Sequence, residues 1–337
     1  MFNRKLYNTV FHQEDISKEK FLITGGAGFI GSNLVEYLLR HGAGHVRVLD
    51  NLSNGYYENI KDFVALPNFE FIDGDIRDLE TCYRAVHDMD YISHQAALGS
   101  VPRSIANPVT SNEVNVSGFL NVLLAAKEST TLKRMVYAAS SSTYGDSPEL
   151  PKIEGNEGSP LSPYAVTKLV NELYADVFSR VFNFHTIGLR YFNIFGPKQN
   201  PNNPYAAVIP IFCKAFIEGV SPVINGDGKT SRDFTFVENA VQANIKAMLL
   251  SSLENHEVMN VACGDQISLI EIVEILSEIS NKHLKPLHGP ERKGDVRHSK
   301  ASIEKIEKLL GYGPKIYFKD GLEIVYNWYS LTKTYGK

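Results

Sequence analysis

The feature of this sequence that most constrains its fold is an alternation of short apolar runs with helical patterns over residues 20–195. Six runs predict strands: FLIT (21–24), VRVLD (46–50), FEFIDGD (69–75), MDYISHQAA (89–97), RMVYAAS (134–140) and HTIGLRYF (185–192). Helical patterns accompany them at 34–42, 79–87, 109–128 and 163–182. Because the runs are apolar throughout, they are typical of a parallel sheet buried on both faces. The pattern therefore predicts an α/β fold with a doubly wound parallel sheet.

Beyond residue 196 this rhythm loosens. The stretch 196–210 is rich in Pro and Asn, 222–233 is rich in turn residues, and short helices are predicted at 268–280 and 300–310. We therefore predict a polar N-terminal arm over 1–19 and a sheet domain over 20–195. A smaller, irregular α+β lobe should occupy most of 196–337, with some of that chain returning to the sheet domain.

Composition argues against several classes of protein. The net charge of −4 gives no excess of positive charge for nucleic acid or an anionic membrane surface. No apolar run approaches the roughly 18 residues that span a bilayer, and the N-terminus lacks the apolar core of a signal peptide. Cys82, Cys213 and Cys263 are too widely spaced for a disulfide framework or a metal site. We expect them to pack in the core of a cytoplasmic protein.

A glycine-rich turn, TGGAGFIG (24–31), follows the first predicted strand and opens the first helix. Gly25, Gly28 and Gly31 allow a tight turn in which the backbone approaches a pyrophosphate, and the helix N-terminus attracts its charge. Asp50, nineteen residues past Gly31 at the end of the second strand, can accept hydrogen bonds from ribose hydroxyls. It would repel a 2′-phosphate, so the sequence predicts NAD rather than NADP. Asp75 could contact the adenine or cap the following turn.

The stretch SPYAVTK (162–168) can carry acid–base chemistry. Ser162 and Pro163 predict the start of a helix, which places Tyr164 and Lys168 on one face, one turn apart. A nearby ammonium or an oxidised nicotinamide lowers the pKa of a phenol, so Tyr164 could take a proton from a sugar hydroxyl. Serines at 140–142, after a predicted strand, could share the same substrate oxygen.

Together these motifs resemble the extended short-chain dehydrogenase/reductase superfamily, and within it the UDP-hexose 4-epimerases. The resemblance rests on the glycine pattern, HQAA (94–97), the serine run, the Tyr164–Lys168 pair and RYFNIFGP (190–197), and it extends from about residue 20 to about residue 330. It implies a Rossmann domain, with Tyr164 as base and acid, Lys168 as its tuner and ribose ligand, and Ser140 as the partner serine. Ser141 and Ser142 stay open as alternatives for that serine or as substrate contacts.

The resemblance also implies a set of binding residues. For NAD they are Gly25, Gly28, Phe29, Ile30, Gly31, Asp50, Asn51, Ser53, Asn54, Gly55, Asp75, Ile76, Gln95, Ala96, Ala97, Asn115, Tyr164, Lys168 and Tyr191. For a UDP-sugar they are Ser100, Arg103, Ser141, Ser142, Asn193, Gln199, Ala207, Val208, Asn225, Arg232, Arg292, Asp295 and Ser299. Arg232 and Arg292 are similar to the diphosphate clamps of the family, and Asp295 to its uridine-ribose contact. No metal is implied.

Two features select a reaction and a sugar. Where related dehydratases and decarboxylases have carboxylic residues, this chain has Ser141-Ser142-Thr143-Tyr144, which favours epimerisation. In the epimerases a tyrosine at the position of Ser299 restricts the enzyme to plain hexoses, whereas a small residue leaves room for an N-acetyl group. Ala207 would keep the pocket open, and Gln199 or Ser141 could bind the acetamide. LGSVPRS (98–104) and YAAVIP (205–210) resemble the subgroup that prefers UDP-N-acetylhexosamines.

Three alternatives stay open at this point: an epimerase of plain UDP-hexoses, an epimerase of UDP-hexuronic acids, and a non-catalytic NAD-binding protein. A uronic acid would need a cation near C6, for which Arg103 and Lys198 are candidates. The helices at 109–128 and 163–182 carry apolar residues beyond one core-facing stripe, which predicts a homodimer with the four-helix contact of the family. Those residues are Phe119, Leu120, Leu123, Leu124, Leu169, Val170, Leu173, Val177 and Phe178.

Overall fold

A parallel seven-stranded sheet organises the molecule. The computed structural model describes residues 6–202, 207–291 and 297–332. In order across the sheet the strands are β3 (Phe69–Asp73), β2 (His45–Asp50), β1 (Lys20–Thr24), β4 (Tyr91–His94), β5 (Arg134–Ser140), β6 (Thr186–Tyr191) and β11 (Glu257–Val261). The order reverses between β1 and β4, so a crevice opens beyond the carboxyl ends of these strands. The predicted doubly wound α/β fold is confirmed.

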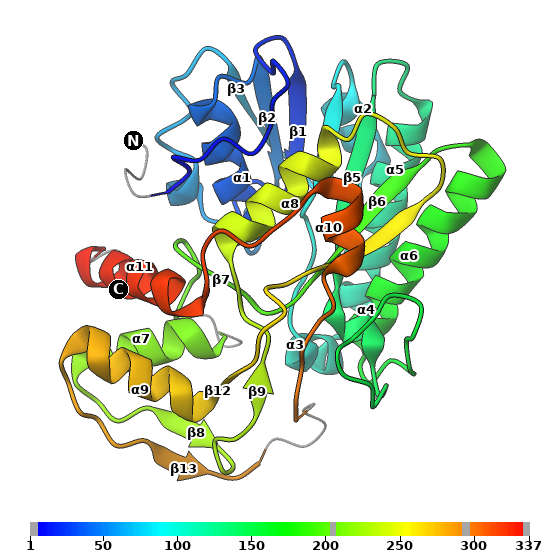
Figure 1. Ribbon diagram of the computed structural model, residues 1–337. Coiled ribbons are helices and arrows are strands. Elements are labelled where there is room, and N and C mark those ends of the chain that lie inside the picture. The colour runs from blue at the N-terminus through cyan, green and yellow to red at the C-terminus, as the bar shows by residue number, and fades with distance from the viewer. Residues whose placement is uncertain (1–5, 203–206, 292–296, 333–337) are drawn as a thin grey trace.

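Helices cover both faces of the sheet (Figure 1). Phe21 and Ile23 of β1 join the buried cluster under α1 (Phe29–Arg40) and α8 (Val237–Met248). Leu22, between them, joins the opposite cluster, under α2 (Leu79–Val86), α5 (Phe119–Glu128) and α6 (Pro163–Phe182). Alternate side chains thus enter different cores, which is why the strand sequences are apolar throughout.

Helix formation matches the sequence prediction on one side of the sheet. The predicted helix at 163–182 is α6. The predicted helix at 109–128 comprises α4 (Pro108–Asn112), the π-helical segment η2 (Glu113–Gly118) and α5. A Cβ on Gly118 would lie 2.6 Å from Cδ1 of Ile76, so any larger residue would require the Ile76 side chain, in the loop after β3, to shift. Short helical turns complete this part of the chain: η1 (Tyr57–Asn59), α3 (Val101–Ala106) and η3 (Ser141–Tyr144).

The smaller lobe gathers three helices and two short sheets (Figure 1). The helices are α7 (Val208–Glu218), α9 (Leu269–Ser280) and α11 (Phe318–Leu331). The sheets pair β8 (Val223–Asn225) with β13 (Leu287–Gly289), and β9 (Ser231–Arg232) with β12 (Ile267–Ser268). A third pair, β7 (Ile194–Phe195) with β10 (Thr235–Phe236), lies where the chain passes between the lobes. β11, α8 and α10 (Glu304–Leu310) pack with the sheet domain although they follow residue 196.

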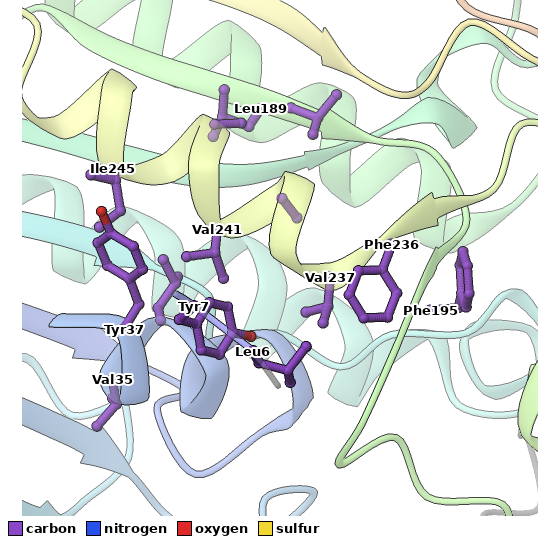
Figure 2. Close-up of a cluster of buried hydrophobic side chains, with 14 of the residues drawn as sticks. Leu6, Tyr7, Val35, Tyr37, Leu189, Phe195, Phe236, Val237, Val241 and Ile245 are labelled. Atoms are coloured by element: carbon purple, nitrogen blue, oxygen red, sulfur yellow. The ribbon is translucent and has the colours of Figure 1, made fainter. Parts of the chain in front are cut away.

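The expectation of a polar N-terminal arm is wrong for its described part. Leu6, Tyr7, Phe11 and Ile16 are buried in the cluster that also holds α1 and α8 (Figure 2). The ring of Phe11 stacks on that of Tyr37, with centroids 5.3 Å apart. The apolar residues of the arm are separated by polar and charged ones and repeat with neither a helical nor a strand period. Hydrophobic periodicity therefore does not predict that they are buried.

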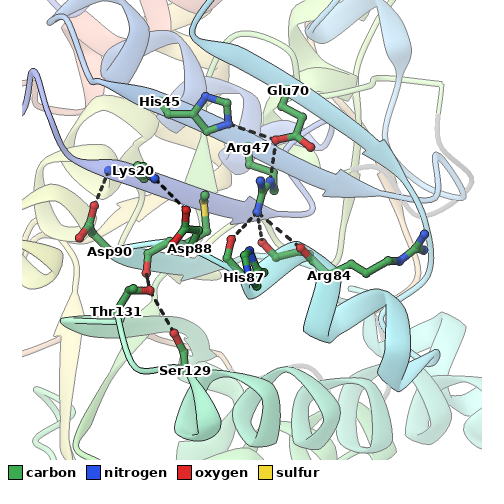
Figure 3. Close-up of polar contacts among 12 residues, drawn as sticks. Lys20, His45, Arg47, Glu70, Arg84, His87, Asp88, Asp90, Ser129 and Thr131 are labelled. Atoms are coloured by element: carbon green, nitrogen blue, oxygen red, sulfur yellow. Dashed lines mark hydrogen bonds and ion pairs between the residues drawn. The ribbon is translucent and has the colours of Figure 1, made fainter.

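Polar contacts brace the opposite edge of the sheet, at the amino ends of the strands (Figure 3). Arg47 of β2 donates to Glu70 of β3 at 2.7 Å and to the carbonyls of Ala85 and His87, which end α2, at 2.9 and 2.8 Å. A guanidinium at a helix C-terminus satisfies carbonyls that have no partner within the helix. In the described ranges no helix combines the length and the apolar content needed to cross a bilayer.

Candidate active site

A cavity of about 500 Å³ lies at the carboxyl ends of the strands. The residues that follow β1, β2, β3 and β4 line one part of it, and the ends of β5 and β6 line another. The loops at 51–56 and 198–200 and the residues before α3 complete the wall. The cavity therefore occupies the crevice that doubly wound sheets use for ligands.

The glycine turn forms the floor of the cavity beside the start of α1. Gly25 has a φ of +66°, and a Cβ there would lie 2.7 Å from the backbone nitrogen of Ala96. A Cβ on Gly31 would lie 2.2 Å from the carbonyl oxygen of Gly25. Since Gly28 has no side chain, the first N–H groups of α1 face the cavity unobstructed. Such a cradle suits a pyrophosphate.

Two aspartates mark the far end of the cavity. The carboxylate of Asp50 accepts from the backbone N–H groups of Ala27 and Leu52, at 3.0 and 2.9 Å, while burial raises its pKa. Asp75 lies two residues beyond β3 rather than in it. It accepts from Arg77, including that residue's backbone N–H at 2.9 Å, and these bonds lower its pKa to about 2. Asp75 thus caps the turn and also lines the cavity.

Tyr164, Lys168 and Ser140 come together at the other end. The Oγ of Ser140 accepts from the hydroxyl of Ser142 at 2.9 Å, and Ser140 in turn hydrogen-bonds to the Tyr164 side chain. Nζ of Lys168 lies 6.0 Å from the centre of the Tyr164 ring and donates to the carbonyl of Ala138 at 2.8 Å. A chain of hydroxyls therefore leads from Ser142 through Ser140 to the phenol.

The electrostatics of this pair differ from the sequence prediction. Burial raises the pKa of Tyr164, and the hydrogen bond from Ser140 opposes this only in part. Burial also lowers the pKa of Lys168 to about 8, against the opposing effect of Glu172. The Lys168 ammonium is directed to the Ala138 carbonyl, with Nζ 6.0 Å from the centre of the Tyr164 ring. Ser140 is the group that favours the phenolate here.

Two serines fix the first turn of α6, on which Tyr164 lies. Ser162 is the N-cap and accepts from the backbone N–H of Ala165 at 3.1 Å, as predicted. Ser104 of α3, fully buried, accepts from the backbone N–H of Tyr164 at 3.0 Å. Nothing in the sequence marked Ser104, because the contact joins two helices 60 residues apart.

A buried polar network fixes the middle of the cavity wall. Gln95 donates to Ser93 at 2.8 Å and to Asn244 of α8 at 3.1 Å, and it accepts from the Tyr191 hydroxyl at 3.1 Å. Asn244 also donates to Tyr191 at 2.7 Å. Sequence reasoning missed Ser93 and Asn244, which orient Gln95 and Tyr191 within the wall.

Asn115, predicted as a cofactor-side residue, makes buried polar contacts behind the cavity wall. It is buried and does not line the cavity. Its amide accepts from the N–H of Leu98 at 2.7 Å and donates to the Leu98 carbonyl and to Thr167 of α6, at 3.1 and 3.2 Å. Asn115 therefore ties the loop after β4 to the helix that carries Tyr164.

Residues predicted for the sugar line the cavity near Tyr164. They include Asn193, Gln199 and Ala207, with Ser100 and Arg103 at the start of α3. The side-chain oxygen of Gln199 is buried and has no hydrogen-bond partner within 6–202, 207–291 and 297–332. Lys198 instead pairs with the buried Glu36 at 2.9 Å. Gln199 thus lines the cavity with one side-chain oxygen still unsatisfied by the described residues, whereas the charge of Lys198 is already matched.

With this geometry in view, comparison with known proteins is decisive. Residues 21–262 match the NAD dependent epimerase/dehydratase family. The chain belongs to this family.

Several members are similar over nearly their whole length. The putative UDP-glucose 4-epimerase of Methanocaldococcus jannaschii is 34% identical over 91% of this chain and 97% of its own. A UDP-N-acetylglucosamine 4-epimerase from Methanobrevibacter ruminantium, solved with UDP-N-acetylmuramic acid, is 36% identical, with a TM-score of 0.87 over 92% of this chain and 98% of its own. A UDP-glucuronic acid 4-epimerase from Bacillus cereus, solved with its nucleotide sugar and NAD, is 30% identical, with a TM-score of 0.84 over the same shares.

NAD is the cofactor of this family member, and the cavity fits it. Gly25 and Gly31 allow a backbone packing at the start of α1 that no Cβ would permit, and Asp50 stands at the end of β2, where a ribose would lie. The predicted cofactor residues that line the cavity are Gly25, Gly28, Phe29, Ile30, Gly31, Asp50, Asn51, Ser53, Asn54, Gly55, Asp75, Ile76, Gln95, Ala96, Ala97, Tyr164, Lys168 and Tyr191.

Other predicted residues lie away from the cavity wall. Ser142 reaches the cavity only through Ser140, while Ser141 lies beside it in η3. Arg232 donates to the carbonyl of Ser231 at 2.9 Å, and the N–H of Ser299 donates to the same carbonyl at 3.1 Å. Val208 begins α7 and Asn225 ends β8, both in the smaller lobe. Arg292 and Asp295 lie outside the described residues.

Proposed function

We propose that this protein is an NAD-dependent UDP-sugar 4-epimerase whose preferred substrates are UDP-N-acetylglucosamine and UDP-N-acetylgalactosamine. Membership of the NAD dependent epimerase/dehydratase family supports the reaction class. The similarity to 4-epimerases that are named for three different UDP-sugars supports a UDP-sugar as the substrate. The choice of an N-acetylated sugar rests on the residues around the cavity.

The acid–base chemistry falls to Tyr164. Its hydroxyl, hydrogen-bonded to Ser140, is the group placed to exchange a proton with the sugar 4-hydroxyl. Bound NAD would supply the hydride acceptor and donor. Ser140 would share the sugar oxygen, while Lys168 supplies positive charge behind the phenol. Tyr164 would take the proton of the 4-hydroxyl as hydride leaves C4 for NAD, which gives a 4-keto sugar. After this sugar has turned over, Tyr164 would return the proton to the oxygen as hydride comes back to the opposite face, so that C4 is inverted.

The carboxylates of the cavity argue against elimination of water. Among the described residues that line it, Asp50 and Asp75 are the only acids, and both stand at the end away from Tyr164. A 4,6-dehydratase needs a carboxylic acid and base beside the keto sugar. Since none of the described residues that line the cavity near Tyr164 is such a group, return of the hydride to C4 is the outcome that the site favours.

Gln199 is the observation that carries the preference for an acetamide. Its side-chain oxygen is buried and lacks a partner within the described chain, so a turn of the side chain into the cavity that Gln199 lines would let an acetamide N–H satisfy it. Ala207, also in the wall, occupies little of the space that an acetyl group needs. A plain hexose offers a hydroxyl there and leaves this space unfilled.

The epimerase of UDP-hexuronic acids is less well supported by these residues. A carboxylate at C6 needs an accessible cation, and Lys198 pairs with Glu36 at 2.9 Å in a buried position. Arg103 donates to Asn54 at 3.2 Å, on the side of the cavity where the cofactor loop lies. We assign the diphosphate to Arg232 and Arg292 and the uridine ribose to Asp295, as the family resemblance implies.

A pair of variants tests the N-acetyl assignment. In Gln199→Ala we expect kcat/KM for UDP-N-acetylglucosamine to fall roughly tenfold, about the worth of one hydrogen bond in a buried site. The value for UDP-glucose should change little. Equal losses for both sugars would show that Gln199 does not read the acetamide.

Ser299→Tyr tests the gate that the family resemblance implies at Ser299. A phenol ring in place of the hydroxymethyl group should clash with the acetamide, at a cost of about 1–3 kcal/mol, and so slow the acetylated sugars by roughly ten- to a hundredfold. Ser299→Ala, which adds no volume, is the matched control and should retain the preference. Unchanged turnover of UDP-N-acetylglucosamine in Ser299→Tyr would remove Ser299 from the gate.

A further inference from the structure

The segment that carries Gln199 is held from behind by helix α1. The carbonyl of Pro197 accepts from the amide of Asn33 at 3.2 Å. Nζ of Lys198 donates to the carbonyl of Ser32 at 3.2 Å and to Glu36 at 2.9 Å. Lys198 has a φ of +72°, a conformation that costs a non-glycine residue about 1 kcal/mol or more. The hydrogen bonds to α1 therefore stabilise this unfavourable backbone conformation of Lys198.

Asn33 is in turn fixed by the N-terminal arm. The hydroxyl of Tyr7 donates to the side-chain oxygen of Asn33 at 2.7 Å, and both residues are fully buried. Because that oxygen is engaged, the amide nitrogen is directed to the carbonyls of Phe29 and Pro197, at 2.8 and 3.2 Å. Tyr7 itself has a φ of +57°, and Figure 2 shows it among the side chains of α1 and α8.

We propose that the N-terminal arm is a positioning element of the sugar site, in which Tyr7, acting through Asn33, holds residues 197–199 so that Gln199 faces the sugar. The arm precedes residues 21–262, which match the family, so this role belongs to a part of the chain that the match does not cover. The inference rests on the proposed function, since it takes Gln199 as the contact to the acetamide.

A neighbouring tyrosine provides a matched control. Tyr37 is as fully buried as Tyr7, and their rings lie 6.0 Å apart in the same cluster. Its hydroxyl accepts from the N–H of Phe11 at 2.7 Å and contacts Nδ1 of His12 at 2.8 Å. The Tyr37 hydroxyl thus contacts only the arm in these bonds, whereas the Tyr7 hydroxyl binds Asn33, which in turn binds the carbonyl of Pro197. Loss of either hydroxyl should destabilise the fold to a similar degree, but only loss of the Tyr7 hydroxyl should reach the cavity.

The experiment compares Tyr7→Phe and Tyr37→Phe in the full-length holoenzyme. Hydrogen–deuterium exchange of a peptide covering 194–202 should be several-fold faster in Tyr7→Phe and unchanged in Tyr37→Phe. KM for UDP-N-acetylglucosamine should rise roughly three- to tenfold in Tyr7→Phe, the range of one net hydrogen bond, with kcat nearly unchanged. Asn33→Ala, which removes the bond to Pro197 itself, should speed the same exchange at least as much.

Unchanged exchange at 194–202 in both Tyr7→Phe and Asn33→Ala would overturn the inference. So would faster exchange in Tyr7→Phe without a rise in KM, because the segment would then not serve the sugar. If the unmodified protein turns over no N-acetylated sugar, the proposed function fails, yet the exchange comparison still decides whether the arm holds the segment.

Discussion

At the scale of single residues, the proposed chemistry depends on one phenol and the hydroxyl beside it. Burial raises the pKa of Tyr164, and Ser140 is the partner that opposes the rise. Tyr164→Phe keeps the ring and removes the proton carrier. We expect turnover to fall by about 10²–10⁴-fold, the usual contribution of general acid–base catalysis. Steady-state kinetics on UDP-N-acetylglucosamine measures this, and near-normal turnover would end the assignment.

Lys168 gives a prediction for stability against pH. Burial lowers its pKa to about 8, whereas the unfolded chain should keep the ordinary value near 10.5. Between these values the unfolded state binds more protons, so rising pH stabilises the fold, and below pH 8 the buried charge costs roughly 3 kcal/mol. Lys168→Met removes this group. The stability of the unmodified protein relative to Lys168→Met should therefore rise from pH 8 to pH 10.5, as measured by urea unfolding. A constant difference would contradict the lowered pKa.

The site residues that could be predicted from the sequence are those that belong to a local sequence pattern. Gly25 and Gly31 follow a strand and open a helix, and Tyr164 follows an N-cap, so local patterns place them. Ser104, Asn244 and Asn115 act across distant parts of the chain, and no local pattern reports such contacts. The direction of the pKa of Tyr164 also depends on burial, which the spacing of Tyr and Lys does not show.

At the scale of elements, the sequence predicted the helices α1, α2, α5, α6 and α9 and missed α8. Helix α8 is buried on every side and carries Glu238, Asn239, Gln242 and Asn244 inside the core. The side-chain amides of Asn239 and Asn244 bond to a loop and to the active-site network. The polar residues of α8 therefore do not form a solvent-facing stripe in its sequence. The burial of the N-terminal arm was missed for a similar reason. Tertiary contacts hold the arm in place, and its sequence has no regular hydrophobic period.

The start of α6 offers a test at this scale. Ser162→Ala removes the N-cap of the helix that carries Tyr164, and we expect a loss of about 1 kcal/mol in unfolding free energy together with a lower kcat. Ser268→Ala removes the capping box of α9, in the smaller lobe. It should cost similar stability and leave kcat unchanged. Equal kcat in the two variants would show that the cap does not position Tyr164.

At the scale of the whole molecule, α6 presents an apolar stripe to solvent. Val166, Leu173 and Val177 are 49%, 57% and 40% exposed, with Val181 continuing the row. Phe119, Leu123 and Phe178, also predicted for an interface, instead face the core. The exposed stripe still favours a homodimer through α5 and α6, which we propose as the assembly.

Leu173→Glu tests this assembly. A charge in the centre of an apolar interface should dissociate the dimer, so light scattering at micromolar concentration should give the 37.6 kDa of one chain. Val223→Glu, at a site of similar exposure on β8, is the control and should leave the mass at twice that value. If the unmodified protein is already monomeric, the dimer proposal is wrong.

The measurement that tests the central proposal most directly is a comparison of kcat/KM for UDP-N-acetylglucosamine, UDP-glucose and UDP-glucuronic acid with the unmodified protein. The Gln199 oxygen, which has no partner among the described residues, the small Ala207 and the ion-paired Lys198 together predict that kcat/KM for the acetylated sugar exceeds the value for each of the others by roughly tenfold or more. The product should be its C4 epimer, UDP-N-acetylgalactosamine. A higher kcat/KM for UDP-glucose or UDP-glucuronic acid would contradict the proposed substrate.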